Sequence, residues 1–516
     1  MTDEQRNDGQ STDRQSNAER SNDRAVAFGV VLGATALTLV VAAAPTPAGL
    51  SPNGQRALAT ALFAAVLWIT GALPLPVTAL TVPVWLTVLG VSPTLEEPLA
   101  GFADPVVFLF LATFVLAAAL QKHGLDRRVA LRLLGAVGRT PHRIVLGVMV
   151  TTAVLSMVIS NTATVALMAP VALGIVQQGE NASENFQTAT MLGVAYAGSI
   201  GGIGTLVGTP PNAIVVAALR DAGYEIGFLQ WLAVGLPVVV VTLPVAWYVL
   251  IRLYPLEDVE VAKRANFGTD EMGTTTPAGR RVAAVFAATA GLWILGGTGA
   301  LFESVLSPRW YTTLFGGLGP SIVGPGAYQG LTYFVLVGMA AIPVLFLVGG
   351  IEWDDVAGID WGTLILFGGG LSLANALGET GATDWLATLV LGSLGDAPLV
   401  VLLGAIVVLT VALSELASNT ATAALLAPIL IEVGRALGGV AGGLEAAVLL
   451  PLTCAIAASY GFALPVATPP NAIVFGTGEV TRGQMLRAGG LLDVLFVFVT
   501  TGLVVVLAAV VWPGIV

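Results

Sequence analysis

Runs of about 18 or more predominantly apolar residues recur along this chain from residue 25 to residue 512. Each run is long enough to cross the roughly 30 Å hydrocarbon layer of a bilayer as a helix. Only 10% of the residues are charged, whereas a soluble chain carries about a quarter. We therefore predict an all-α polytopic membrane protein. Residues 1–24 form a polar tail that is too hydrophilic to fold alone.

Two apolar regions, 143–175 and 399–433, are too long to be single membrane helices, because about 34 helical residues would extend about 50 Å. A polar triplet lies near the middle of each, in SNTATVALMAP (160–170) and SNTATAALLAP (418–428). Two arms that meet at the triplet would form a re-entrant hairpin, which is tolerated where its tip is buried in protein or lines a wet cavity. The other segments then supply eleven transmembrane helices.

The triplet belongs to a longer duplication. GTPPNAIV at 208–215 returns as ATPPNAIV at 467–474, and a weaker match pairs residues 105–124 with 362–381. The offset between the two copies is nearly constant, so the chain divides into repeat halves at 25–270 and 271–516. The tandem prolines predict broken helices at 187–220 and 443–476. Repeats with interrupted membrane helices are typical of secondary transporters, whose binding site lies at the repeat interface.

Basic residues indicate the orientation, because cytoplasmic loops are enriched in Lys and Arg. With this arrangement, most basic residues outside the tail fall on one side: Lys122, Arg127, Arg128, Arg132, Arg139, Arg143, Arg252, Lys263, Arg264, Arg280, Arg281, Arg482 and Arg487. Four fall on the other: Arg56, Arg220, Arg309 and Arg435. This bias predicts a cytoplasmic N-terminus and an extracellular C-terminus. The first hairpin then opens inside and the second outside, so the halves have inverted topology.

The motifs predict sites for a cation and for an anion. Ser, Thr and Asn side chains favour helix N-caps, so each hairpin tip can present a helix N-terminus with free N–H groups that suit a carboxylate. Thr209 and Thr468 are the expected N-caps of the restarted helices, each followed by proline. The unpaired carbonyls of a broken helix, with Ser, Thr and Asn oxygens, suit a dehydrated Na⁺.

Each triplet is preceded by a further serine four residues earlier. Ser156 with Ser160, and Ser414 with Ser418, would share a helix face and point at one ion. The motifs contain no Lys or Arg. The charge of a bound anion would therefore be offset by cations and helix dipoles, which makes anion binding depend on Na⁺.

Acidic residues leave one alternative open. Glu415 could carry protons or serve as a structural hydrogen-bond acceptor, and Met157 holds its place in the first repeat. Asp104 is expected at a solvated span boundary, and residues 352–355 are expected to form an exposed acidic loop. Zinc-protease, P-loop and aspartyl-dyad motifs do not occur, so we expect neither an enzyme nor a nucleic-acid-binding protein.

At the SNT and TPPN repeats the chain resembles the divalent anion/sodium symporter family, and the similarity extends over residues 25–512. The resemblance implies an eleven-span inverted-repeat fold with two opposed hairpins, a homodimer and an elevator-type mechanism. It implies a first sodium site at Ser156, Ser160, Asn161 and Gly208, and a second at Ser414, Ala417, Asn419 and Ala467. It places the substrate carboxylates at Asn161, Thr162, Asn419 and Thr420, with Thr209, Thr468 and Pro469 nearby; Asn212 and Asn471 are expected to brace the loops.

We therefore expect a sodium-coupled symporter in the plasma membrane that brings a C4-type dicarboxylate, such as succinate, malate or fumarate, into the cell. Sodium is the coupling ion, and membrane lipids and a second copy are the expected partners. One alternative is the same fold carrying sulfate or another oxyanion with sodium, or exchanging anions. Another is a sodium/proton-type antiporter that uses Glu415.

Overall fold

The computed structural model describes residues 24–135, 140–177, 183–256, 275–394, 397–416, 418–439 and 445–510. Over these ranges the chain is helical and contains no β-strand. This agrees with the all-α class predicted from the apolar runs. Apart from Arg24, which begins the first helix, the predicted polar tail lies outside the described residues.

The helices follow the predicted hairpin and broken-helix ranges closely. The first half contains a helix over Arg24–Ala43, α2 (Pro52–Thr70), α3 (Leu75–Val88), α4 (Glu96–Leu99), η1 (Ala100–Ala103), α5 (Pro105–Lys122), α6 (Leu125–Gly135), α7 (Pro141–Ser156), α8 (Asn161–Gln177), α9 (Glu184–Gly202), α10 (Pro210–Asp221) and α11 (Phe228–Leu253).

The second half contains α12 (Pro277–Gly296), η3 (Gly299–Leu301), α13 (Pro308–Phe315), α14 (Phe334–Leu347), α15 (Trp353–Ala357), α16 (Trp361–Glu379), α17 (Ala382–Leu394), α18 (Leu399–Leu416), α19 (Asn419–Leu437), α20 (Ala446–Ala458), α21 (Pro469–Gly476) and α22 (Arg482–Val510). Within the described ranges, 8 helices are long and apolar enough to cross a membrane, and further apolar helices are shorter. The chain is therefore a multi-pass membrane protein, and the count of eleven spans stays a prediction.

Each repeated motif coincides with an interruption between helices. Residues 157–160 separate α7 from α8; α18 ends at Leu416, and α19 begins at Asn419. Residues 203–209 separate α9 from α10, and residues 459–468 separate α20 from α21. Both α10 and α21 begin at the first proline of TPPN, where the missing N–H is not needed by the helix.

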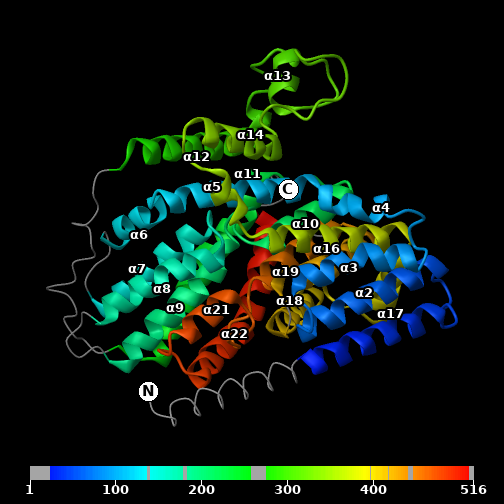
Figure 1. The fold of residues 1–516 in the computed structure, drawn as a ribbon, viewed down its shortest axis with the longest axis horizontal. Helices are drawn as coiled ribbons and strands as arrows, with labels where there is room; N and C mark the ends of the chain where they lie inside the picture. The colour runs from blue at the N-terminus through cyan, green and yellow to red at the C-terminus, as the bar shows by residue number, and fades with distance from the viewer. Residues whose placement is uncertain are drawn as a thin grey trace, which may run out of the picture.

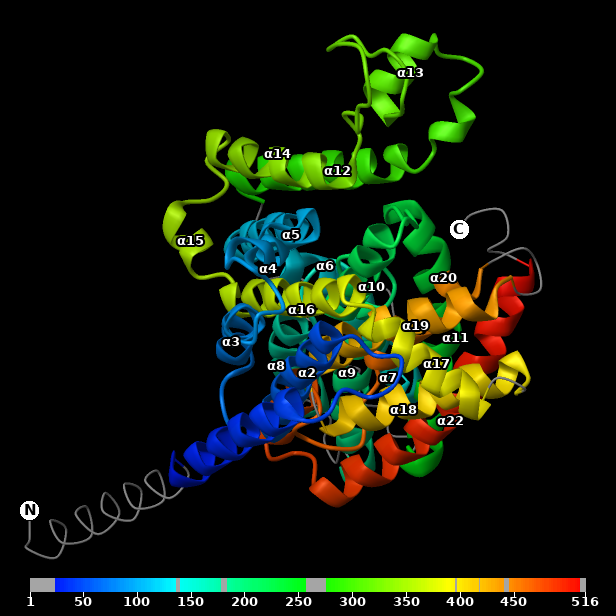
Figure 2. The same ribbon diagram turned by 90° about the vertical axis from the view of Figure 1, so that its right-hand side faces the viewer.

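The helices form two packed groups. In the first, which we call the frame, α2, α3, α5, α12, α14 and α16 pack on one another. The second, which we call the hairpin group, contains α7–α11 and α18–α22. Figure 1 shows α12 and α14 along one edge of the molecule, with α13 projecting beyond them. Figure 2 shows the same edge from the side, with α5 and α16 between it and the hairpin group.

Within the hairpin group the two repeats interlock. The second arm of the second hairpin, α19, packs against α10 of the first broken helix. The second arm of the first hairpin, α8, packs against α21 of the second broken helix. This crosswise packing holds the motifs of the two repeats against each other.

Candidate functional site

The first hairpin tip is organised by the end of α7. This helix ends at Ser156, and Ser160 lies beyond the turn, directly before α8. The Ser160 hydroxyl oxygen accepts a hydrogen bond from the Ala163 N–H at 3.3 Å, as an N-cap does. The expectation that Ser156 and Ser160 share a helix face is therefore wrong, because helical periodicity stops at Ser156. By the same reasoning Ser414 and Ser418 do not share a face, because α18 ends at Leu416.

Four polar groups converge beside this tip. The Ser156 hydroxyl donates to the Gly198 carbonyl oxygen in α9 at 2.6 Å, and it lies 2.6 Å from the side-chain amide of Asn161. The same amide position lies 3.2 Å from the carbonyl oxygens of both Gly198 and Gly208. Ser156, Asn161 and Gly208 are thus brought together as predicted, and Gly198 joins them. A main-chain carbonyl has no sequence signature, which is why Gly198 was not foreseen.

The side-chain amide of Asn161 can point either its nitrogen or its oxygen into this cluster. With the nitrogen inward, it donates to Ser156 and to both carbonyls. With the oxygen inward, three acceptor oxygens surround the Ser156 hydroxyl, whose single proton cannot pair with all three, so a cation among them would be favourable. Oxygen ligands without a fixed charge suit a hard cation such as Na⁺. The cluster can therefore exist with and without the ion by turning a single side chain.

The second repeat builds a matching half-site. The Ser414 hydroxyl donates to the Ala458 carbonyl oxygen at 3.0 Å, as Ser156 does to Gly198. The Asn419 Oδ1 atom is buried without a hydrogen-bond partner, which leaves an oxygen free for a cation or substrate. Ala417, a predicted ligand, lies outside the described residues. Ala467 is buried at the end of the loop before α21.

The loops of both broken helices are braced by the asparagine of TPPN. Asn212 Nδ2 donates to the carbonyls of Gly202 and Thr205, at 3.0 and 2.8 Å. Asn471 Nδ2 donates to the carbonyls of Gly461 and Leu464, at 2.9 and 3.0 Å. Both side chains are fully buried. The spacing is the same in the two repeats, which confirms the predicted bracing role.

The predicted substrate residues differ in exposure. Thr162 and Pro469 are exposed, whereas Thr209, Thr420 and Thr468 are buried. The Thr468 hydroxyl oxygen accepts from the Asn471 N–H at 3.3 Å, so it caps α21 as expected. Thr209 occupies the N-cap position of α10 but makes no such bond with its side chain. Its hydroxyl is therefore free for another partner.

Glu415, near the end of α18, accepts hydrogen bonds from the second loop. Its carboxylate accepts from the N–H groups of Ala463 at 2.7 Å and Leu464 at 3.0 Å. Asp493 of α22 accepts from the preceding N–H group, that of Phe462, at 3.4 Å. Carboxylates that hold successive backbone donors fix the loop conformation.

Two acidic features differ from expectation. Asp104 is not a solvated boundary residue: it caps α5 through the Val106 N–H at 2.8 Å and pairs with Arg220. Asp355, expected in an exposed acidic loop, pairs with Lys122 at 2.6 Å. Sequence periodicity carries no signal for such pairs, because the partners are more than a hundred residues apart.

Comparison with known proteins identifies the family to which this chain belongs. Residues 27–515 match the model of the sodium:sulfate symporter transmembrane region. The chain belongs to the sodium:sulfate symporter family. This confirms the resemblance to divalent anion/sodium symporters. The family consists of secondary transporters with sodium as coupling ion, so the chain is a transporter and not an enzyme.

Several curated relatives are similar to the chain over most of its length. It is 35% identical over 479 residues to a sodium-dependent dicarboxylate transporter, SdcS, of Staphylococcus saprophyticus, which covers 88% of this chain and 86% of the relative. SdcS of Staphylococcus aureus USA300 is 33% identical over 460 residues, covering 86% and 84%. An uncharacterized transporter of Haemophilus influenzae is 37% identical over 451 residues, covering 87% and 90%.

Solved structures share the fold at low identity. The YdaH transporter of Alcanivorax borkumensis matches with a TM-score of 0.55 at 16% identity, covering 81% of this chain and 87% of that one. MtrF of Neisseria gonorrhoeae matches with a TM-score of 0.56 at 14% identity, covering 93% and 94%. These similarities show that the chain shares the fold of these transporters.

A glycine beside the Asn161 amide gives a direct test of the first cluster. A Cβ added to Gly202 would lie 2.5 Å from Asn161 Oδ1 and 3.1 Å from the Thr209 Cβ. Gly202→Ala should therefore displace the amide and raise the half-saturating sodium concentration about tenfold or more, because residues that orient a metal ligand change metal affinity by such factors. The measurement is sodium-dependent uptake by reconstituted protein.

The control is Gly174→Ala. Gly174 lies in α8, and its added Cβ would meet nothing within 4 Å. This variant should keep the parent's sodium dependence and gain about 0.5–1 kcal/mol of helix stability. An unchanged sodium dependence in Gly202→Ala would contradict the placement of Asn161 in the sodium site.

Proposed function

We propose that this protein is a sodium-coupled symporter that brings a C4-type dicarboxylate, such as succinate, malate or fumarate, into the cell. The observation that carries the proposal is the pair of repeat-related oxygen clusters at Ser156–Asn161 and Ser414–Asn419, built from uncharged groups. The names of the staphylococcal relatives support dicarboxylate as the substrate.

Sodium would bind first at each cluster. At the first, the ion would contact Ser156, Asn161, Gly198 and Gly208; at the second, Ser414, Asn419 and the loop that ends at Ala467. Turning the Asn161 oxygen toward the ion directs its Nδ2 group away from the cluster, where it can donate to a substrate carboxylate. Bound cations also supply the positive charge that the site lacks. Sodium binding and anion binding are thereby coupled.

The substrate would lie between the two tips. The free Thr209 hydroxyl, the side chains of Thr162 and Thr420, and the N-termini of α8 and α19 supply donors for carboxylate oxygens. Thr468 and Pro469 would border this space. We further propose a cytoplasmic N-terminus, an extracellular C-terminus, a homodimer, and an elevator motion of the hairpin group against the frame.

Uptake into proteoliposomes tests the substrate. Labelled succinate should accumulate when an inward sodium gradient is imposed and should not accumulate with an equal potassium gradient. Labelled sulfate is the parallel arm, since the family description names sulfate. Sulfate uptake without succinate uptake would replace the dicarboxylate assignment by an oxyanion symporter. If preloaded anion exchanges with external anion in the absence of sodium, the protein is an anion exchanger and the symport assignment is rejected.

A graded series at Glu415 tests the antiporter alternative. Glu415→Gln keeps one acceptor oxygen for the loop and removes the charge, so sodium-driven uptake should be largely retained. Glu415→Ala leaves the N–H groups of Ala463 and Leu464 unpaired, at about 1–3 kcal/mol each, and should reduce uptake strongly. An antiporter that carries protons on Glu415 would instead lose pH-driven sodium movement in both variants.

A further inference from the structure

The two repeats are not equally exposed, although their sequences match. On the first hairpin, Thr162, Ala166 and Pro170 form an exposed stripe along α8. Their counterparts 258 residues later, Thr420, Ala424 and Pro428 of α19, are buried. The asymmetry means that the rest of the chain leaves the stripe uncovered along one hairpin and covers its counterpart along the other.

The broken helices show the same asymmetry. Ala472 and Phe475 of α21 are exposed, whereas their counterparts Ala213 and Val216 of α10 are buried. The buried arms, α10 and α19, pack against α16 of the frame, and α10 also packs against α5. The frame therefore covers the α10–α19 half of the site in this structure. With the orientation proposed above, the site is open to the cytoplasm.

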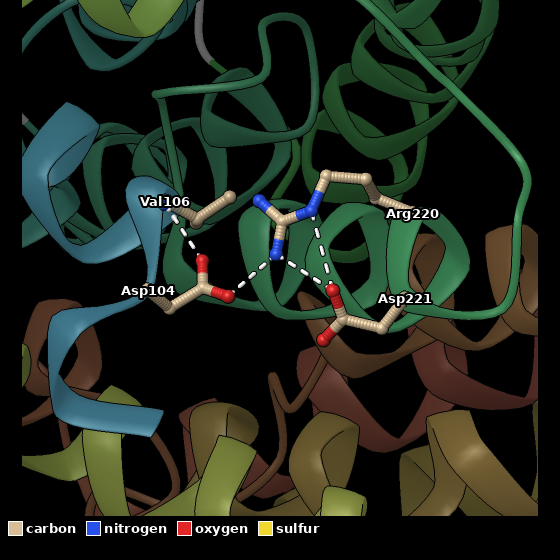
Figure 3. Close-up of polar contacts among 4 residues, drawn as sticks. All are labelled: Asp104, Val106, Arg220 and Asp221. Atoms are coloured by element: carbon tan, nitrogen blue, oxygen red, sulfur yellow. Dashed lines mark hydrogen bonds and ion pairs between the residues drawn. The ribbon is translucent and has the colours of Figure 1, made fainter. Parts of the chain in front are cut away.

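An ion pair joins the frame to the covered half. Figure 3 shows the Arg220 guanidinium at the end of α10 between the carboxylates of Asp104, at the start of α5, and Asp221. Arg220 Nη2 lies 2.5 Å from Asp104 Oδ2 and 2.8 Å from Asp221 Oδ1. The side chains of Arg220 and Asp104 are only 23% and 10% exposed, so the pair is shielded from bulk water.

Both partners of this pair have a second partner on their own helix. Asp104 Oδ1 also accepts from the Val106 N–H, and Arg220 Nε also donates to Asp221 at 3.2 Å. If the pair separates, neither charge is left alone, which avoids the large cost of a buried unpaired charge. Such a contact can open and close reversibly.

Open space lies on both sides of the pair. A cavity of about 640 Å³ is lined by Val106, Arg220 and Tyr333, and another of about 530 Å³ by Asp104, Asp221 and Arg435. At this end of α10, contact with the frame therefore depends on few groups. At its other end α5 pairs through Lys122 with Asp355 of α15, and this second pair does not involve the hairpin group.

We propose that the Asp104–Arg220 pair is a latch between the frame and the hairpin group that stabilises the conformation with the α10–α19 half closed. The latch rests on the elevator motion proposed above: it must separate before the site opens on the other side. Asp104 and Arg220 are thus positioning residues that set the balance between the two access states, and they do not contact sodium or substrate.

Cysteine accessibility tests the latch without requiring transport. In a Cys454→Ala background, Thr162→Cys and Thr420→Cys report the exposed and the covered tip, respectively. Each is labelled with a membrane-impermeant maleimide from either side of sealed vesicles, without sodium or substrate. In the parent, Thr162→Cys should react much faster. Arg220→Gln, or Asp104→Asn, which keeps the α5 cap, should shift the ratio of the two rates toward Thr420→Cys by about fivefold or more.

Two further variants complete the test. Arg220→Lys keeps the positive charge and should keep the ratio near that of the parent. Asp355→Asn breaks the pair at the other end of α5 and should leave the ratio unchanged. If the ratio of the two labelling rates is unchanged in both Arg220→Gln and Asp104→Asn, and both variants elute from size-exclusion chromatography like the parent, the latch proposal is overturned.

The same data separate the latch from the substrate assignment. A shifted ratio with no succinate uptake in the parent would reject the proposed substrate and retain the latch. Sodium-driven uptake in the parent with an unshifted ratio in the variants would reject the latch alone. Failure of Thr420→Cys to react from the second hairpin's side in any variant would contradict both the latch and the elevator motion.

Discussion

Sodium-driven succinate uptake should be abolished by Asn161→Ala, and likewise by Asn419→Ala, with a loss of about a hundredfold or more. Asn161 supplies the only side-chain amide in the cluster with Ser156, Gly198 and Gly208, so its removal takes away both the oxygen for the ion and the nitrogen for the empty state. Asn419 holds the free buried oxygen of the other half-site. Initial rates in proteoliposomes at saturating sodium measure the effect.

The control for both variants is Asn185→Ala. Asn185 lies on the surface at the start of α9, where it donates to the Pro255 carbonyl at 3.2 Å, and its removal should leave uptake near the parent level. A sodium-dependent rise in melting temperature, present in the parent and lost in Asn161→Ala, would show that the defect is in ion binding. Parent-like uptake by either site variant would refute the assignment of the half-sites.

The second large effect is expected at the loop braces. Asn212→Ala removes two buried hydrogen bonds from the first loop, and Asn471→Ala removes two from the second. Each loss leaves two loop carbonyls less well paired, at about 1–3 kcal/mol apiece. These loops contain Gly208 and Ala467, whose carbonyl groups are the proposed sodium ligands. We therefore expect the half-saturating sodium concentration to rise about tenfold or more in each variant.

Thermal unfolding distinguishes the loss of fold stability from the loss of sodium affinity in these variants. Both variants should melt at a lower temperature than the parent, and high sodium should recover part of the difference, because binding to the folded state stabilises it. Asn53→Ala, at a surface position beside Arg56, should alter neither property. A brace variant with a lowered melting temperature but unaltered sodium dependence would show that the loop is structural only.

The sequence predicted the positions of the interruptions because prolines and N-capping residues act locally. TPPN must begin a helix, and SNT at the centre of an overlong apolar run must end one. The bracing role of Asn212 and Asn471 was expected from the resemblance to the family, and the hydrogen bonds of both side chains bear it out. The hairpins and broken helices therefore agree closely with the predicted ranges.

Contacts between distant segments were not predictable in this way. The prediction that Ser156 and Ser160 share a helix face was wrong, because it assumed that α7 continues for one more turn beyond Ser156. The Gly198 and Ala458 carbonyls were missed because main-chain atoms carry no residue signal. Asp104 was expected in solvent because its partner, Arg220, is separated from it by 116 residues.

The uncharged half-sites have an electrical consequence. Fixed charges of the hairpin group, such as Glu415, would cross and return in each cycle, so their contributions cancel. The net charge moved is then that of the cargo alone. One divalent dicarboxylate with two sodium ions carries none, and its uptake would not respond to voltage. Each additional sodium ion would make uptake sensitive to the membrane potential by about 2.3 kcal/mol per 100 mV, so inward current per succinate counts the ions beyond two.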